Sequence, residues 1–460
     1  NFKNHWIVKA AVMLVLVAFI SSCEKWIDPE LNVDPDAPGD VPMSLILPAI
    51  QQTMGYSLLG NNSVRTTNIW MQIYDGVARQ SHTEARYQLT AADVNNHWSN
   101  VYTELLNEAK ILHMKAEEEE SPHNAGVAKV ITAYSLAVMT DLYNDIPYTD
   151  ALKGTENVLE PVFDSQELVY GSVFSLLEEA FNDLASGDEP IGINGDVIYG
   201  GDADAWLAAA HATYARAALQ LSKKNGSSAY TTALAHTADA IASNGGDMEV
   251  PFEAANQNPM YQFMDQRTDV RMCQTFIDEL EATADPRLPY LVAETEDGSI
   301  YGSVPGGQDE TASWPGDYIA AQDAPVVLMS YAEVKFIEAE ALLASDPAGA
   351  AEAFNEAVLA SVTKITGEDG TEWMDANNIT ASAGNITLEN IIMQKRIALA
   401  GQIQPFSDWR RTGIPELEMS IGATKTEIPR RFPYSQDEMI YNPDNVPSIG
   451  SIIDPVWWDE

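Results

Sequence analysis

The chain has 460 residues, 45% of them hydrophobic, which is enough to bury a large core in one big domain or in two to three ordinary ones. Its 68 acidic residues against 25 basic ones give a formal net charge of -43, and such a surface excludes nucleic acid and anionic lipid as partners. The same charge argues weakly against polyanionic glycans, because a local basic patch can override a net charge.

The N-terminal segment is typical of an export signal. Two lysines precede an uninterrupted apolar run of 11 residues, 10–20, which is too short to span a bilayer permanently. Two serines then separate the run from Cys23. We therefore expect residues 1–22 to be a signal peptide and Cys23 to be the acylated first residue of a bacterial lipoprotein. The alternative is an ordinary secretory signal with an incidental cysteine.

Cleavage before Cys23 leaves 438 of the 460 residues, and none of the later apolar runs approaches the roughly 20 residues of a membrane span. Residues 23–43 contain four prolines and predict an extended tether. We expect residues 44–460 to form a single domain. Once Cys23 is acylated, Cys273 has no partner for an intramolecular disulfide, so this domain is predicted to depend on packing.

Helical periodicity dominates the rest of the chain. Asp204 and Asp346 are placed to cap helices, and Pro347 stands at a first helical position. Paired helices with tight turns predict tetratricopeptide-like hairpins, although no strict repeat of about 34 residues is present. The expected helices cover residues 127–142, 169–184, 204–221, 230–241, 331–344, 348–361 and 391–399.

Two stretches break this pattern. Between about 245 and 330, and again from 409 to 460, glycine, proline, aspartate and aromatic residues replace the helical spacing. Long irregular stretches in a compact protein are usually functional. The predicted fold class is therefore mainly α, with loop-rich excursions from a helical scaffold.

Motifs of catalysis are absent from the sequence. It contains no Gly-x-Ser-x-Gly elbow, no phosphate-binding loop and no His-Glu-x-x-His pair. Paired carboxylates carry no information, because 68 acidic residues produce almost any spacing by chance. We expect no enzymatic activity, no cofactor and no metal site.

Seven segments of the chain form a characteristic set: residues 141–150, 161–167, 201–206, 285–288, 331–340, 394–413 and 429–438. The most distinctive segment starts at Gln394-Lys395-Arg396 and ends at Trp409-Arg410-Arg411-Thr412-Gly413. In this order, the seven segments resemble those of a known family, the SusD/RagB outer-membrane nutrient-binding lipoproteins.

This resemblance implies a SusD-like helical fold with about four tetratricopeptide-like helix pairs. It also implies a cell-surface lipoprotein that captures a glycan, less often a peptide, and delivers it to a SusC-like TonB-dependent transporter in the outer membrane.

Most motif residues have structural explanations. Trp206 is expected in the core. Four arginines are expected to pair with partners such as Asp408 or Glu333, because a guanidinium forms planar bidentate pairs: Arg396, Arg410, Arg411 and Arg430.

A glycan site needs exposed aromatic rings with polar neighbours, so an aromatic in a polar loop is a better candidate than one on a helical stripe. Trp314 satisfies this test best, and Tyr87, in a polar stretch, forms a second focus. Trp70 is weaker, because it lies four residues before Tyr74 on a probable helix face. The candidate ligand-binding residues are Trp314, Tyr87, Tyr318, Tyr301, Arg86 and Trp70.

Other aromatic residues are assigned differently. Trp98 and Tyr102 are expected to be structural. Trp457 and Trp458 either pack back onto the domain or touch the transporter. The charge favours a neutral oligosaccharide or polysaccharide as ligand. The alternatives are a peptide-binding lipoprotein, a helical scaffold for protein partners and a glycan-active enzyme.

Overall fold

The computed structural model describes residues 40–460. The expected signal peptide, the anchor at Cys23 and nearly all of the tether therefore lie outside the described residues. Residues Met43–Glu460 form one compact unit with many long-range contacts.

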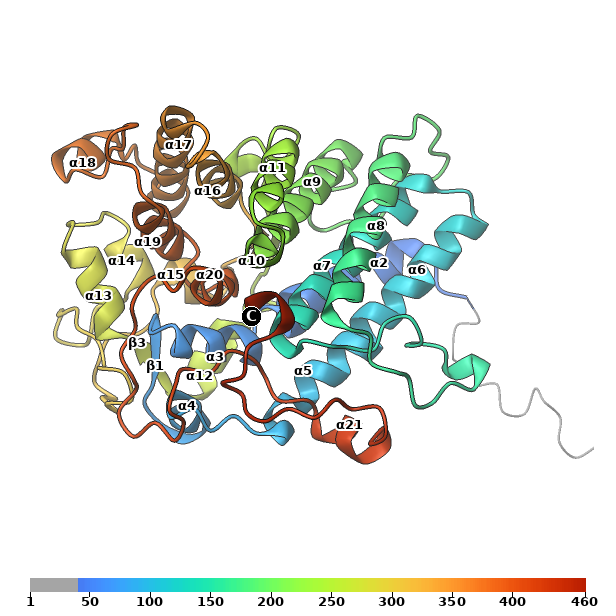
Figure 1. The fold of residues 1–460 in the computed structure, drawn as a ribbon, viewed down its shortest axis with the longest axis horizontal. Helices are drawn as coiled ribbons and strands as arrows, with labels where there is room; N and C mark the ends of the chain where they lie inside the picture. Colours follow the sequence, from blue (N-terminus) through green and yellow to red (C-terminus); the bar gives the residue numbers. More distant parts are fainter. Residues whose placement is uncertain (1–39) are drawn as a thin grey trace, which may run out of the picture. The chain divides into compact units, whose positions relative to one another are not determined.

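Helices make up most of this unit, so the mainly α fold class is confirmed (Figure 1). In the first half, the α-helices are α2 (Met43–Thr53), α3 (Asn62–Trp70), α4 (Arg79–Ala85), α5 (Asn95–Asn100), α6 (Asn107–Glu118), α7 (Pro122–Tyr143), α8 (Gln166–Leu184), α9 (Ala203–Gln220), α10 (Ser222–Asn225) and α11 (Ser227–Thr237). In the second half, they are α12 (Pro259–Gln266), α13 (Gln274–Glu281), α14 (Leu288–Leu291), α15 (Asp317–Ala320), α16 (Tyr331–Leu342), α17 (Pro347–Thr366), α18 (Thr371–Ala376), α19 (Leu388–Ala398), α20 (Gln404–Thr412) and α21 (Gln436–Tyr441).

Short 3-10 and π segments connect or extend these helices. They are η2 (Met54–Leu58), η3 (Ala91–Val94), η4 (Val101–Leu106), η5 (Gly154–Glu156), η6 (Asn244–Gly246) and η7 (Trp457–Asp459). The strands are β1 (Tyr74–Gly76), β2 (Met248–Val250), β3 (Val270–Met272) and β4 (Val326–Met329).

Neighbouring helices pack in pairs: α7 packs against α6 and α8, α9 against α11, and α16 against α17 and α19. The predicted turn between α16 and α17 is confirmed, since the Asp346 carboxylate accepts the Gly349 N–H at 3.1 Å and Pro347 opens α17. The predicted cap of α9 is wrong by two residues. Asp202, not Asp204, accepts the first free N–H groups of that helix.

Helix α7 is long and apolar enough to cross a membrane by length and composition, which the sequence analysis did not expect. However, 78% of its apolar window is buried within the protein. Its apolar residues therefore pack against α6 and α8 in the core.

The region expected to be irregular, residues 245–330, contains four short helices, α12 to α15, and three short strands, so that prediction is only partly right. Strand β3 pairs antiparallel with β1, and β2 pairs antiparallel with β4. Tyr74 lies in β1 and pairs with Met272, which corrects the expectation that it shares a helix face with Trp70. Helix α3 ends at Trp70, and Gln72 then takes a positive φ of 54°.

The four motif arginines are buried or half-buried in the α16–α20 region and beside the C-terminal segment. The predicted pairing is confirmed for three of them: Arg396 with Glu279 at 3.0 Å, Arg411 with Asp408 at 3.0 Å, and Arg430 with Asp459 at 2.5 Å.

The other two details of that prediction need correction. Glu333 pairs with Arg216 at 2.6 Å rather than with any of the four. Arg410 donates instead to the carbonyls of Asp141 and Arg430, at 2.6 and 2.9 Å, and no ion pair to it is found within residues 40–460. Trp206 is fully buried, as predicted.

The C-terminal segment packs back onto the domain. Trp458 is fully buried, and its indole N–H donates to the Asp141 carboxylate at 2.7 Å. Trp457 is half-buried, with the Lys224 ammonium 5.2 Å from its ring centre. The structure therefore decides the open question for Trp458 in favour of packing.

Cys273 is a free, buried thiol, and burial raises its pKa to about 12. Because the thiolate is the reactive form, we expect Cys273 to resist an excess of a thiol-reactive dye in the native protein. In denaturant, Cys273 should react at once. A chain that lacks residues 1–23 has this single cysteine, so it should release one equivalent of the coloured dye product. Fast labelling of the native protein, followed by absorbance, would contradict this burial.

Candidate functional site

A cavity of about 860 Å³ lies among the segments that follow α12, β3 and α14, a size typical of ligand sites. Its walls come from α12, from β3, from the turn at 293–297 and from the 301–320 segment. Trp314 and Tyr301 both line it. The structure thus brings two of the six candidate residues into one cavity.

The Trp314 side chain is half-buried, and a cation packs against one face of its ring. The Arg271 guanidinium carbon lies 4.6 Å from the centre of the indole ring. A cation over an aromatic face is attracted by the ring quadrupole. Arg271 therefore holds one face of Trp314, while the ring also lines the cavity.

Backbone hydrogen bonds fix the position of Trp314. The Ala293 N–H donates to the Trp314 carbonyl at 2.9 Å, and the Met272 N–H donates to the Ser313 carbonyl at 2.8 Å. Two residues on, a Cβ at Gly316 would lie 2.3 Å from the Tyr290 carbonyl oxygen, so only glycine fits this close approach. The loop is therefore held between β3 and the end of α14.

Tyr301 is fixed in the same loop. Its hydroxyl donates to the Thr311 carbonyl or side-chain oxygen, at 2.9 and 2.8 Å, and the Ser313 N–H donates to its carbonyl at 2.8 Å. With its hydroxyl satisfied locally, Tyr301 offers the cavity a ring in a fixed orientation.

A buried carboxylate anchors the loop from the opposite end of the sequence. Asp75, in β1, accepts the Ser303 hydroxyl at 2.6 Å and the Gly306 N–H at 2.8 Å. Burial raises the pKa of Asp75, and these hydrogen bonds oppose that rise. The loop that carries Tyr301 and Trp314 is thus attached to the first strand of the domain.

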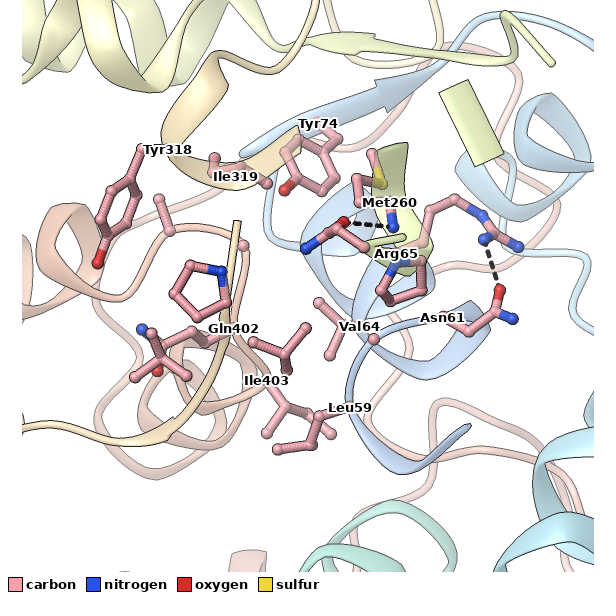
Figure 2. A pocket seen from close by; sticks show the side chains of 18 residues that line it. Leu59, Asn61, Val64, Arg65, Tyr74, Met260, Tyr318, Ile319, Gln402 and Ile403 are labelled. Carbon is pink, nitrogen blue, oxygen red and sulfur yellow. Dashed lines mark hydrogen bonds between the residues drawn. The ribbon is translucent and has the colours of Figure 1, made fainter. Parts of the chain in front are cut away.

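Tyr318 lies in a different, smaller cavity, which corrects the expectation that it shares a site with Trp314. That cavity has a volume of about 50 Å³, room for a few waters rather than a sugar ring. Figure 2 shows Tyr318 at one end of its lining and Arg65 with Asn61, joined by a hydrogen bond of 3.2 Å, at the other. Burial raises the pKa of Tyr318 to about 12.

Trp70 and Tyr87 are core residues, and their prediction as ligand platforms is wrong. Trp70 is 0% exposed and packs against Phe406 and Phe432, with ring centres 5.7 and 5.4 Å away. Tyr87 is 1% exposed, and its hydroxyl accepts the Ser420 N–H at 3.1 Å. A polar sequence neighbourhood misled the prediction for Tyr87, because the C-terminal segment that covers it is more than 300 residues away.

Arg86 also binds the C-terminal segment rather than the cavity. Its Nε donates to the Gly422 carbonyl at 2.9 Å, and its own carbonyl accepts the Thr424 N–H at 3.0 Å. Arg86 and Tyr87 therefore hold residues 420–424 in place through hydrogen bonds.

A buried carboxylate beside Trp70 makes stability depend on pH. Glu84 is 1% exposed, and neither of its carboxylate oxygens has a hydrogen-bond partner within residues 40–460. Burial raises its pKa from 4.5 to about 7; Arg65 opposes the rise, while Asp93 and Asp269 add to it. Proton binding at Glu84 thus stabilises the fold below about pH 4.5, and this contribution is lost as the pH rises through about 7.

We expect Glu84→Gln to remove this dependence. At about 1.4 kcal/mol for each pH unit between the two pKa values, the variant should exceed the parent above pH 7 by up to about 3 kcal/mol. Urea unfolding at pH 5 and pH 8 measures the difference. The exposed Glu104→Gln is the matched control, and identical pH profiles for parent and Glu84→Gln would contradict the prediction.

Sequence reasoning missed several lining residues of the large cavity. Arg271 could not be identified from the sequence, because a single arginine in an irregular stretch belongs to no recognisable motif. The acidic residues were discarded because carboxylates are so numerous in the chain. The missed polar and aromatic residues are Tyr261, Asp265, Arg271, Glu294, Glu296 and Asp297.

Comparison with known proteins gives three findings. Residues 35–435 match the SusD-like family described as "Starch-binding associating with outer membrane". Solved structures share the fold. A susd/ragb family protein from Bacteroides thetaiotaomicron is 23% identical with a TM-score of 0.79, covering 91% of this chain and 99% of that one. No curated protein matches the chain.

Two further solved structures are of proteins described as chitin-binding. A chitin-binding protein is 23% identical with a TM-score of 0.77, covering 91% of this chain and all of that one. A chitin-binding SusD homolog from Flavobacterium johnsoniae is 19% identical with a TM-score of 0.79, covering 91% and 98%. At these identities the likeness establishes the fold alone.

Proposed function

Because this chain belongs to the SusD-like family of starch-binding proteins associated with the outer membrane, we propose that it captures a glycan at the cavity of Trp314 and Tyr301. It passes the glycan to a SusC-like transporter and performs no chemistry on it. The leader and Cys23 support a lipid anchor that keeps it at the cell surface.

The observation that carries this proposal is that two aromatic residues held by local contacts, Trp314 and Tyr301, line the same cavity. Sugar rings have apolar faces edged by hydroxyls, and they bind where an aromatic face stands beside polar groups. Trp314 is supported by Arg271, and Tyr301 by Thr311, so neither ring needs to be ordered when a ligand arrives. Fixed rings lower the entropic cost of binding.

Native affinity electrophoresis tests the capture step. The protein without residues 1–23, which keeps the whole compact unit Met43–Glu460, is run through gels that contain starch, other neutral polysaccharides or soluble chitin derivatives. Retardation by one glycan, with no reducing ends released on long incubation, is the expected result. Release of reducing ends would indicate a glycan-active enzyme instead.

Retention of peptides or of other proteins without retention of any glycan would contradict the proposal. In that case the peptide-binding or scaffold alternatives would account for the family membership. Co-purification with the transporter from outer membranes tests the delivery step separately.

A further inference from the structure

The lining of the Trp314 cavity is far more acidic than the chain as a whole. Six of its 17 residues are carboxylates, against 68 of 460 in the full sequence. They are Asp265, Glu294, Glu296, Asp297, Glu310 and Asp317. The excess is local, because a second cavity of about 440 Å³ at α6–α8 is lined by three lysines and a single glutamate.

Arg271, the cation in this lining, does not neutralise these carboxylates by direct contact. Its Nε and Nη2 donate to the Glu310 carbonyl at 3.0 and 2.6 Å, and its Nη1 donates to the Thr268 and Val270 carbonyls at 2.9 Å each. The guanidinium is therefore committed to backbone oxygens and to the face of Trp314.

Most of the carboxylates, in contrast to Arg271, have no bonding partner among the described residues. Asp297 accepts the Thr295 hydroxyl at 2.7 Å and the Ser299 N–H at 3.1 Å. In the part of the chain that the structure describes, the side chains of the other five make no ion pair or hydrogen bond: Asp265, Glu294, Glu296, Glu310 and Asp317. Nor do three histidine, cysteine or acidic side chains converge as a metal site anywhere in residues 40–460.

Spaced, unpaired carboxylates around two aromatic rings fit a ligand whose positive charges are also spaced. A concave site lined by one sign of charge concentrates the opposite sign and repels its own. A polymer of amine-bearing sugars offers a cation on each ring and an apolar face for Trp314 and Tyr301. Anionic sugars are repelled, and neutral ones can donate hydroxyl hydrogen bonds to the carboxylates but gain no charge attraction.

We propose that this cavity selects glycans with free amino groups, such as chains of unacetylated hexosamine, over their neutral N-acetylated counterparts. The proposal rests on the glycan-capture function above and narrows its ligand. It also reverses the preference for a neutral glycan that net charge alone favoured, because the local field of the cavity decides the ligand.

Calorimetry with matched hexamers tests the proposal. Glucosamine hexamer and N-acetylglucosamine hexamer are titrated at low ionic strength, at a pH where the amines are protonated, into the chain without residues 1–23. We expect the glucosamine hexamer to bind at least about tenfold more tightly, with the advantage shrinking as salt screens the charges.

Two triple variants isolate the cavity carboxylates. Glu294→Gln/Glu296→Gln/Asp317→Asn should remove the tenfold advantage, measured as the ratio of the dissociation constants of the two hexamers for the same variant. The control, Glu104→Gln/Glu118→Gln/Glu119→Gln, neutralises three exposed carboxylates outside this cavity and should retain the advantage. An equal loss in the control would overturn the proposal, because it would assign the preference to net charge.

The remaining outcomes separate this inference from the proposed function. If both hexamers bind equally and Trp314→Ala weakens both, capture stands and amine selectivity is wrong. If no glycan binds, or Trp314→Ala changes nothing, the capture site itself is wrong. If a lysine hexamer displaces the glucosamine hexamer at equal concentration, the cavity recognises charge on peptides and the sugar assignment falls.

Discussion

Replacing Trp314 by alanine is expected to weaken glycan binding by about 30-fold or more, which corresponds to about 2 kcal/mol for an aromatic residue at the centre of a site. The side chain lines the cavity and is half-buried, so the variant loses the platform but little of the core. The lost contact with Arg271 is worth about 0.5–1 kcal/mol at such a site. The thermal midpoint should therefore stay nearly unchanged.

Trp409→Ala is the matched control for this experiment. Trp409 is also half-buried, and the Arg430 guanidinium carbon lies 5.1 Å from the centre of its ring, but it is not among the residues that line the cavity. Binding to this control should equal that of the parent in the same titration. A large fall in the midpoint for Trp314→Ala would instead place Trp314 in the core and remove the proposed site.

Replacing Arg411 by alanine is expected to lower the free energy of unfolding by about 3–5 kcal/mol, because it leaves the buried carboxylate of Glu340 without its cation. Arg411 in α20 bonds both carboxylate oxygens of Glu340 in α16, with Nη2 to Oε2 at 2.7 Å, and it also pairs with Asp408 at 3.0 Å. Lys395 of α19 pairs with the other oxygen of Asp408 at 2.8 Å. All four side chains are 5% exposed or less.

A double variant separates the loss of a charge from the loss of a helix contact. Arg411→Met with Glu340→Leu removes one charge of each sign and leaves the Lys395–Asp408 pair balanced. Replacing a whole buried pair by apolar residues is often neutral, so most of the lost stability should return. Urea denaturation followed by circular dichroism measures both variants. A loss below about 1 kcal/mol in Arg411→Ala would show that water reaches the cluster.

The helices that the sequence predicted share one property, which is a repeating apolar stripe. The stripes at 127–142 and 348–361 became α7 and α17 with only a few residues added at each end. Helices α12 and α13 were missed because each has only eight residues, too few for the spacing to repeat.

Side-chain exposure was harder to predict than helices, because exposure depends on which distant segment covers a residue. Trp314 and Tyr87 both stand among polar residues, yet one lines a cavity and the other lies beneath residue Ser420. Similarly, Asp202 rather than Asp204 caps α9. The spacing of residues in the sequence does not distinguish between these two nearby aspartates. Local sequence identifies candidate aromatic residues, and tertiary contacts select among them.

The attachment of the Trp314 loop has a consequence for how such receptors diversify. The atoms that fasten the loop belong to Asp75, to β3 and to groups of the loop itself, whereas five of the six carboxylates around the cavity make no ion pair or hydrogen bond within residues 40–460. Mutation can therefore recharge the cavity without unfastening the loop. A change of charge at one of these five positions therefore alters what the cavity presents to a ligand and leaves the hydrogen bonds that hold the loop in place.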